Sequence, residues 1–143
     1  MKRKHRARKH FKGNLPLEKP PLKENLHIQK GNIPLNTARS DRISFSVLRN
    51  ERNNIREIEN ISYEIYVGDN WEWVVRYDDH SGRGFLHRHY RISLNDKSEV
   101  ESSAGIRRYK SKDHELTWVC NDIKRNYLIF RAKFLKNSKL DLY

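Results

Sequence analysis

Residues 71–92 read WEWVVRYDDHSGRGFLHRHYRI, and this stretch decides the fold because it contains two strand-like runs around one loop. Over residues 71–78, large apolar side chains alternate with mostly polar ones, which is the period of a half-buried strand. A second run over residues 85–94 alternates in the same way, with Arg88 as the one charged residue among its apolar positions. Residues 79–84 contain two glycines and form the connecting loop, so the two runs predict an antiparallel hairpin.

Two further strands are predicted upstream of this hairpin. Residues 43–48 and 63–67 each show the same alternation of apolar and polar side chains. Gly-Asp-Asn at residues 68–70 supplies turn chemistry between the second of these strands and the hairpin.

Downstream, residues 113–136 have the pattern of one long amphipathic helix, and either Asp113 or Ser111 is suited to cap its N-terminus. Apolar residues recur at spacings of three and four, namely Leu116, Val119, Cys120, Ile123, Tyr127, Phe130 and Phe134. A sheet needs one covered face, and this helix offers one apolar stripe. The sequence therefore predicts an α+β domain over residues 41–143, in which a small antiparallel sheet of about four strands packs on one long C-terminal helix.

The first 40 residues differ in composition from the rest. They hold eleven Lys or Arg, two acids and all four prolines, whereas residues 41–143 hold nineteen Lys or Arg and sixteen acids. Residues 1–40 are therefore predicted to form a flexible basic arm. Its opening is a candidate phosphate-binding segment, with a solubilising tail as the plain alternative. The cations of that segment are Lys2, Arg3, Lys4, Arg6, Arg8 and Lys9.

Composition favours a polyanionic partner and argues against several other classes of protein. The formal net charge is +12, and Lys or Arg side chains that meet phosphates release counterions, so RNA or DNA is the expected partner. The single cysteine, Cys120, excludes an internal disulfide and a cysteine-based zinc motif. No apolar run is long enough for a membrane span or a secretory signal, so a cytoplasmic protein with no membrane partner is expected.

Strand periodicity divides the predicted sheet into two faces. If the large apolar residues face the helix, the other face carries Ser44, Ser46, Glu64, Tyr66, Glu72, Val74, Arg76, Asp78, His87, His89 and Arg91. Arg76 and Asp78 then approach His87 and His89 across the hairpin. A merely solvated polar face is the plain alternative, although exposed strands ordinarily favour Thr, Lys, Glu and Val over imidazoles.

This cluster suits metal-free cleavage of RNA, which needs no cofactor. Attack by a ribose 2′-hydroxyl needs a base and the leaving oxygen needs an acid, and histidine serves both roles near neutral pH. Arg76 and Arg91 would stabilise charge on the phosphate, and Asp78 would orient one imidazole. The candidate catalytic residues are His87, His89, Asp78, Arg76 and His80.

Two alternatives remain open on the same residues. The His87-x-His89 pair also suits a metal ion, with Asp78 or His80 as a third ligand. The protein could instead bind RNA or DNA without catalysis, with Arg83 in the Ser-Gly-Arg-Gly loop among the phosphate ligands.

Aromatic residues permit stacking on unpaired bases, which favours RNA or single strands over duplex DNA. Trp71 and Tyr66 are the candidates for stacking. Trp73, on the apolar side of its strand, and Trp118, beside the helix stripe, are expected to pack in the core.

The segment Arg76-Tyr77-Asp78-Asp79-His80, followed by His87-Arg88-His89, resembles the TumE-like toxins of archaeal and bacterial toxin–antitoxin pairs. In that family an R-Y-D segment is followed by a His-rich H-x-H segment, and the resemblance covers about residues 61–94. It implies an RNA-directed toxin that a small antitoxin protein neutralises. The residues carried over are Arg76, Asp78, His87, His89 and His80. Asp79 departs from the pattern, because many relatives have Asn there.

Overall fold

The computed structural model describes residues 25–78, 86–102 and 111–140. Within these ranges the chain forms six β-strands and one α-helix. The strands are β1 (His27–Pro34), β2 (Asp41–Arg49), β3 (Ile55–Val67), β4 (Asn70–Asp78), β5 (His87–Arg91) and β6 (Glu99–Ser102), and the helix is α1 (Lys112–Ser138).

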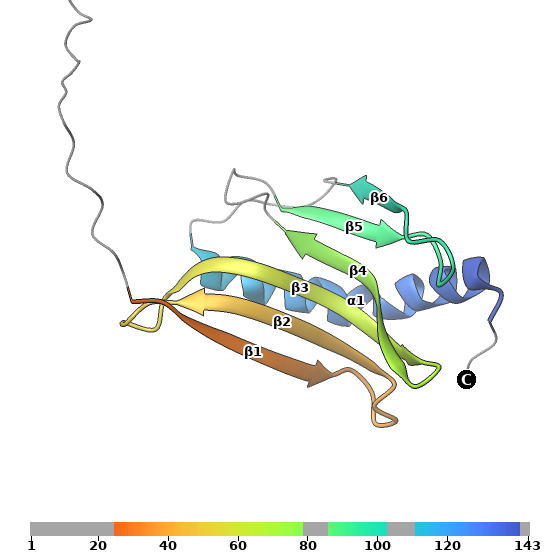
Figure 1. Cartoon of the computed structure of the whole chain (residues 1–143), viewed down its shortest axis with the longest axis horizontal. Helices are drawn as coiled ribbons and strands as arrows, with labels where there is room; N and C mark the ends of the chain where they lie inside the picture. The colour runs from red at the N-terminus through yellow and green to blue at the C-terminus, as the bar shows by residue number, and fades with distance from the viewer. Residues whose placement is uncertain (1–24, 79–85, 103–110, 141–143) are drawn as a thin grey trace, which may run out of the picture.

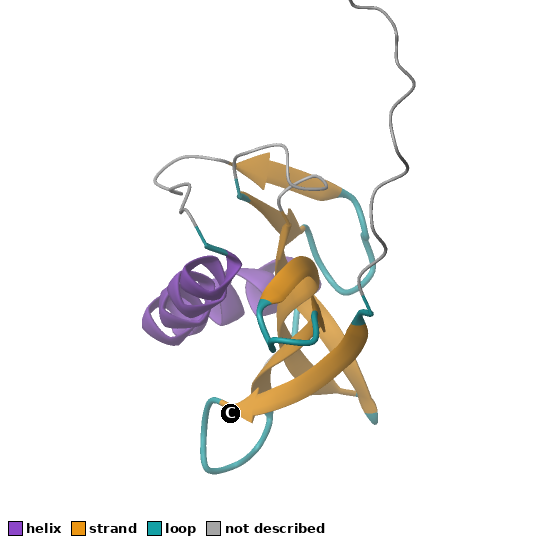
Figure 2. Cartoon of the chain, turned by 90° about the vertical axis from the view of Figure 1, so that its left-hand side faces the viewer, coloured by secondary structure: helices purple, strands orange, loops and turns teal. Residues whose placement is uncertain are grey.

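The six strands form one sheet in chain order, and each strand pairs antiparallel with its predecessor. In Figure 1 the helix α1 lies behind the sheet, and the side view in Figure 2 shows that it covers one face only. The predicted α+β class with an antiparallel sheet against one C-terminal helix is confirmed. The expected number of about four strands is too low, because β1 and β6 were not predicted.

β1 also corrects the expected boundary at residue 41. It pairs with β2 along its whole length, from His27 opposite Arg49 to Pro34 opposite Arg42, so the ordered sheet begins within the segment expected to be a flexible arm. The edge position explains why β1 lacks a buried alternation and tolerates a proline. Residues 1–24 of that arm lie outside the described residues.

The β3–β4 hairpin turns where the sequence predicted a turn. Its loop consists of Gly68 and Asp69, with φ angles of +58° and +66°, and Val67 pairs with Asn70 across it. Two successive positive φ angles are those of the type I′ turn that matches the twist of a hairpin. Glycine followed by aspartate adopts them at low cost.

α1 begins at the predicted cap. The Ser111 hydroxyl accepts a hydrogen bond from the His114 backbone N–H (3.1 Å), and Asp113 and Glu115 place negative charge in the first turn. Lys139, in the left-handed conformation at φ 58°, ends the helix. No helix within the described ranges is long and apolar enough to cross a membrane.

Two buried carboxylates fix the position of α1 on the sheet. The Tyr63 hydroxyl donates to Asp41 (2.6 Å), whose carboxylate also lies 3.3 Å from Arg131 of the helix. Asp122 of the helix accepts a hydrogen bond from the Tyr77 hydroxyl (2.7 Å). These polar contacts specify one docking position on an otherwise apolar interface.

Arg88 belongs to the second of these contacts. It projects from β5 toward α1 and forms an ion pair with Asp122, while its Nη1 donates to the Tyr90 hydroxyl (2.9 Å). The charged residue that interrupts the apolar alternation of residues 85–94 is therefore the partner of a helix carboxylate.

The buried tyrosines predict a loss of stability at alkaline pH. Burial, reinforced by Asp41 and Asp122, raises the pKa of Tyr63 and Tyr77 well above the ordinary value of 10.0. Because each hydroxyl keeps its proton in the folded chain after the unfolded chain has lost it, this stabilisation is complete below about pH 10 and falls as the pH rises. Each tyrosine should lower the free energy of unfolding by about 1.4 kcal/mol per pH unit above pH 10.

Urea unfolding between pH 9 and pH 11.5 measures this slope. Tyr77→Phe should reduce it, whereas Tyr66→Phe, which removes a hydroxyl at a residue that is 44% exposed, should leave it unchanged. Equal slopes in the wild type and the Tyr77→Phe variant would contradict the assignment.

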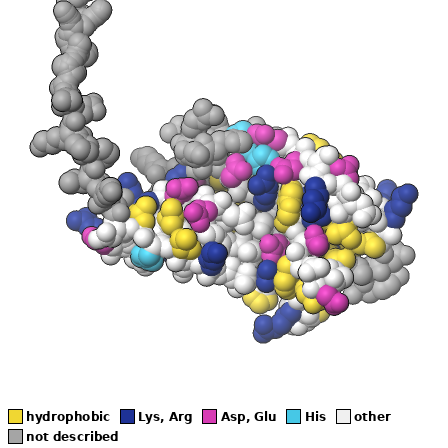
Figure 3. Space-filling view, in the orientation of Figure 1, with side chains coloured by type: hydrophobic (Ala, Val, Ile, Leu, Met, Phe, Trp, Pro, Cys, Tyr) yellow, Lys and Arg dark blue, Asp and Glu magenta, His cyan; other side chains and the backbone are white. Residues whose placement is uncertain are grey.

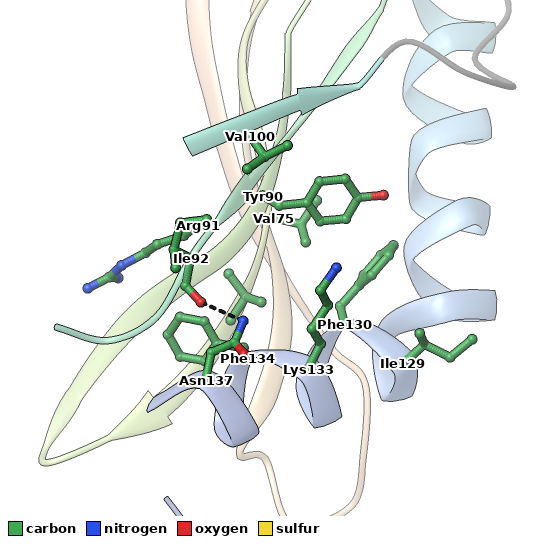
Figure 4. A pocket seen from close by; sticks show the side chains of 11 residues that line it. Val75, Tyr90, Arg91, Ile92, Val100, Ile129, Phe130, Lys133, Phe134 and Asn137 are labelled. Carbon is green, nitrogen blue, oxygen red and sulfur yellow. Dashed lines mark hydrogen bonds between the residues drawn. The ribbon is translucent and has the colours of Figure 1, made fainter. Parts of the chain in front are cut away.

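α1 packs mainly on β3 and β4, and this leaves a cavity of about 320 Å³ between the helix and the β5–β6 edge (Figure 4). Tyr90 and Val100 line its sheet side, and Phe130, Phe134 and Lys133 line its helix side. The walls are mostly apolar. Because Val100 points toward the helix, its neighbours on β6 must point to the opposite face of the sheet.

Candidate active site

A β-bulge in β4 decides which side chains reach the open face, by which we mean the sheet face turned away from α1. Tyr63 of β3 pairs with Val75. The next residue, Glu64, pairs with Trp73, which leaves Val74 without a partner in the register. One extra residue reverses the alternation of side chains. Trp73 therefore joins Glu64 on the open face, and the prediction that it packs in the core is wrong. Val74, expected on the open face, is 2% exposed.

β4 and β5 bring the predicted catalytic side chains together. Arg76 pairs with His89, and Asp78 pairs with His87. Figure 3 shows the open face, with imidazoles in cyan next to acidic side chains in magenta near the β5–β6 edge. The approach of these four residues across the hairpin, as strand periodicity predicted, is therefore present.

β6 adds two carboxylates that the sequence analysis missed. Glu101 forms an ion pair with Nδ1 of His87, and Oε1 of Glu99 lies 3.3 Å from Nδ1 of His89. Oδ2 of Asp78 lies 3.4 Å from Nε2 of His89. Each imidazole is thus within ion-pair distance of a carboxylate, and the His89 ring lies between two of them. The alternation Glu-Val-Glu over residues 99–101 was the available signal.

Arg76 completes the group. Its Nη2 donates to both carboxylate oxygens of Glu99 (2.8 and 2.9 Å), and its guanidinium lies 5.2 Å from the centre of the Trp73 ring. Its side chain is 37% exposed, so solvent and ligands reach it. Arg76, Asp78, His87, His89, Glu99 and Glu101 are called the histidine cluster below.

The charge of the histidine cluster depends on its two imidazoles. One guanidinium faces three carboxylates, so the cluster is net negative when both imidazoles are neutral and balanced when both are protonated. The cluster contains side chains that can accept and donate protons, which is the basic requirement of an acid–base site.

Arg91 is not available for the phosphate-binding role predicted for it. Its side chain is 1% exposed, and its Nη1 donates to Glu72 (3.0 Å) and to the carbonyl of Trp73 (3.2 Å). Its Nη2 donates to the carbonyl of Leu94 (2.9 Å), and its Nε donates to that of Ser93 (3.2 Å). Every guanidinium nitrogen is bonded within the chain, so Arg91 ties β4 to the segment after β5.

Several predicted residues lie outside the described residues. They are His80 and Arg83, in the segment after β4, and Lys2, Arg3, Lys4, Arg6, Arg8 and Lys9, near the N-terminus.

An aromatic row leads along the open face toward the histidine cluster. Tyr66 and Trp71 are cross-strand partners with ring centroids 5.3 Å apart. The Arg42 guanidinium lies 4.0 Å from the centre of the Trp71 ring and donates from Nε to Glu64 (2.7 Å). Trp73, next on the same face, extends the row. The two residues predicted to stack on bases are therefore on the open face, joined by a third aromatic that was expected in the core.

A polar cavity of about 340 Å³ lies between the aromatic row and the histidine cluster. Its walls come from β3, β4 and β6, and they are Asn60, Ser62, Glu64, Trp73, Arg76 and Glu99. It is shared by the indole of the row and the guanidinium of the cluster, so a ligand in it would touch both.

Other reactive groups are less suited to chemistry. Burial raises the pKa of the Cys120 thiol, which disfavours a nucleophilic thiolate at neutral pH. Within the described part of the chain, no group of three or more His, Cys, Asp or Glu side chains is arranged to hold a metal ion.

The C-terminal half of α1 is strongly basic, on the side of the molecule opposite the histidine cluster. Residues 124–139 contain six Lys or Arg and no acid. Arg131 pairs with Asp41, whereas Lys124, Arg125, Lys133 and Lys136 are exposed. Exposed Leu128 and Ile129 lie among them.

One family model matches the chain over residues 31–140, and its description is Domain of unknown function (DUF7718). Comparisons with curated proteins and with solved structures give no match. The matched range runs from within β1 to just past α1 and includes the whole histidine cluster. It does not bear on the resemblance to TumE-like toxins, which stays a prediction.

Proposed function

The chain belongs to the DUF7718 family, and we propose that it is an RNA-directed endoribonuclease that needs no metal ion. One observation carries the proposal. Two imidazoles on one strand face, His87 and His89, each lie within ion-pair distance of a carboxylate, and an exposed guanidinium, Arg76, lies beside them. That set contains a base, an acid and a cation for the phosphate.

The reaction balances without a co-reactant. One imidazole takes the proton of a ribose 2′-hydroxyl while the 2′-oxygen forms a bond to phosphorus. The bond from phosphorus to the 5′-oxygen breaks, and the other imidazole, as imidazolium, gives its proton to that oxygen. The products are a 2′,3′-cyclic phosphate and a 5′-hydroxyl. Asp78 and Glu99, on either side of His89, hold its ring in one orientation.

The carboxylates of the histidine cluster make substrate binding depend on other cations. Arg76 must exchange Glu99 for a phosphate oxygen, a change that costs little because the pair is 31–37% exposed. The basic segment Lys2–Lys9 and Arg83 are the candidates for the remaining phosphate contacts. The affinity for RNA should therefore fall steeply as the salt concentration rises.

The aromatic row supports an unpaired substrate. Tyr66, Trp71 and Trp73 lie on the same face as the histidine cluster, and bases stack on such side chains only when they are released from a duplex. Single-stranded RNA is accordingly the proposed substrate, and the cytoplasm is the proposed location.

The toxin role rests on the resemblance of residues 61–94 to TumE-like toxins. It adds two proposals, growth impairment by the free protein and a small antitoxin protein that neutralises it. Covering the histidine cluster on the open face would be the simplest form of neutralisation.

A second function is RNA or DNA binding without catalysis. The observation that favours it is the exposed basic stripe of α1, which includes Lys124, Arg125, Lys133 and Lys136. In that case the histidines, of which His89 is only 7% exposed, have no catalytic role, and removal of helix cations weakens binding.

The proposal is tested with a mixed single-stranded RNA and its 2′-O-methyl counterpart, each with and without chelator. The RNA should be cleaved equally in both conditions to 2′,3′-cyclic phosphate ends, and the 2′-O-methyl strand should stay intact because it has no nucleophile. Chelator-sensitive cleavage would favour the metal alternative. Binding of both strands without cleavage would favour the second function.

A further inference from the structure

The polar cavity beside Trp73 has the features of a site for one unpaired base. Trp73 supplies an aromatic wall, and the other walls supply hydrogen-bonding groups. Stacking gives affinity for any base, so the choice among bases depends on the polar groups.

Glu64 is the best placed of these groups. It is the direct cross-strand partner of Trp73, and side chains so paired have Cβ atoms about 5 Å apart. Arg42 donates to its Oε1 (2.7 Å), which fixes the carboxylate in place. A carboxylate has about four acceptor positions, so one hydrogen bond from Arg42 leaves the others available to a ligand.

The cavity is rich in acceptors. Glu64 and Glu99 contribute carboxylates, and Arg76, the one cation in the wall, already donates to Glu99. The Asn60 amide nitrogen points to the Ser62 hydroxyl (3.4 Å), which leaves the amide oxygen as a further acceptor. A matching ligand must therefore present hydrogen-bond donors.

Guanine is the base that fits an acceptor pair. Its N1–H and N2 amino group lie side by side on one edge, and a carboxylate accepts both at once. Adenine, cytosine and uracil each place at most one donor group on that edge, next to an acceptor that a carboxylate would repel. We infer that the cavity formed by Trp73 and Glu64 binds guanine and directs the proposed ribonuclease to guanosine in single-stranded RNA.

This inference rests on the proposed function for its biological meaning, but it deepens the account of the carboxylates. Carboxylates on a phosphate-binding face repel the phosphates, whereas carboxylates in a base-binding site can select one base over another. The cavity borders Arg76, so a base held on Trp73 places its own phosphate near the histidine cluster.

Binding of mononucleotides tests the inference without any need for cleavage. The probes are guanosine, inosine and adenosine 5′-monophosphates, titrated by calorimetry into the full-length protein. The guanosine nucleotide should bind roughly tenfold more tightly than the inosine nucleotide, which lacks the N2 amino group, and the adenosine nucleotide should bind more weakly still.

Two variants and one control localise the effect. Glu64→Gln should abolish the preference for guanosine over inosine. Trp73→Ala should lower the binding affinity for all three nucleotides by roughly tenfold. Glu57→Gln removes the same charge from an exposed position on the same strand and should change nothing. Equal affinities for the three nucleotides in the folded wild type, or an unchanged preference in Glu64→Gln, would overturn the inference.

The two proposals fail separately. Guanosine-selective binding that depends on Glu64 supports the inference even if the protein cleaves no RNA. Cleavage without any preference for guanosine overturns the inference while leaving the ribonuclease in place.

Discussion

Replacing Asp122 with alanine should destabilise the protein by about 3–5 kcal/mol, the usual cost of removing one partner from a buried ion pair. The residue is 4% exposed. Its carboxylate accepts from the Tyr77 hydroxyl (2.7 Å) and pairs with Arg88, so its removal leaves a phenol and a guanidinium facing an apolar interface. Since the free energy of unfolding of a domain is about 5–15 kcal/mol, such a loss removes a large share of its stability.

Urea unfolding at neutral pH measures this loss. Asp113→Ala is the matched control, because its carboxylate lies in the same helix but is 53% exposed and 3.6 Å from its partner Arg49, so it should cost less than about 1 kcal/mol. Adding Arg88→Met to Asp122→Ala should restore part of the loss, because it removes the stranded charge. Similar losses for Asp122→Ala and Asp113→Ala would contradict the role given to the pair.

Much of the fold could be predicted because local pattern and burial agree. The alternation in β2 and the stripe of α1 report which residues meet the core, and Gly68 marks the turn before β4. β1 escaped prediction because an edge strand buries little, so its sequence carries no alternation. β6 escaped because it has four residues and three of them are exposed.

Only those contacts of the site that lie within one hairpin could be predicted from the sequence. Arg76, Asp78, His87 and His89 belong to one hairpin, so strand periodicity places them together. Glu99 arrives through a separate strand, and nothing in a single sequence states which strand lies next to β5. Arg91 was misassigned because a charged residue on an alternating strand gives no sign that backbone carbonyls will bury it.

Trp73 shows a different limit. The β-bulge at Val74 adds one residue to β4, so the side chains on its two sides follow opposite alternation. No turn residue or glycine marks this bulge in the sequence. Its consequence is functional, because it moves an indole from the expected core to the wall of the polar cavity.

Loss of both imidazoles should have the largest effect on activity. General acid and general base catalysis each contribute about 100–10,000-fold, so His87→Ala/His89→Ala should lower the rate of RNA cleavage by at least about a thousandfold. Affinity for RNA should change little, because phosphate contacts are assigned to other cations. His87→Gln/His89→Gln keeps similar volume and gives the same test if the alanine variant unfolds, which circular dichroism reports.

His27→Ala/His114→Ala is the matched control, because it removes two exposed imidazoles from β1 and from the first turn of α1. This control should cleave at the wild-type rate and should bind RNA as the wild type does. It separates a general effect of losing histidines from the role of the histidine cluster.

The most direct test of the account is therefore the rate of cleavage of a mixed single-stranded RNA in chelator, compared between the wild type and the folded His87/His89 double variant. The wild type should cleave the RNA, and the variant should cleave it at least about a thousandfold more slowly. Equal rates in the two proteins, or no cleavage by the folded wild type, would contradict it.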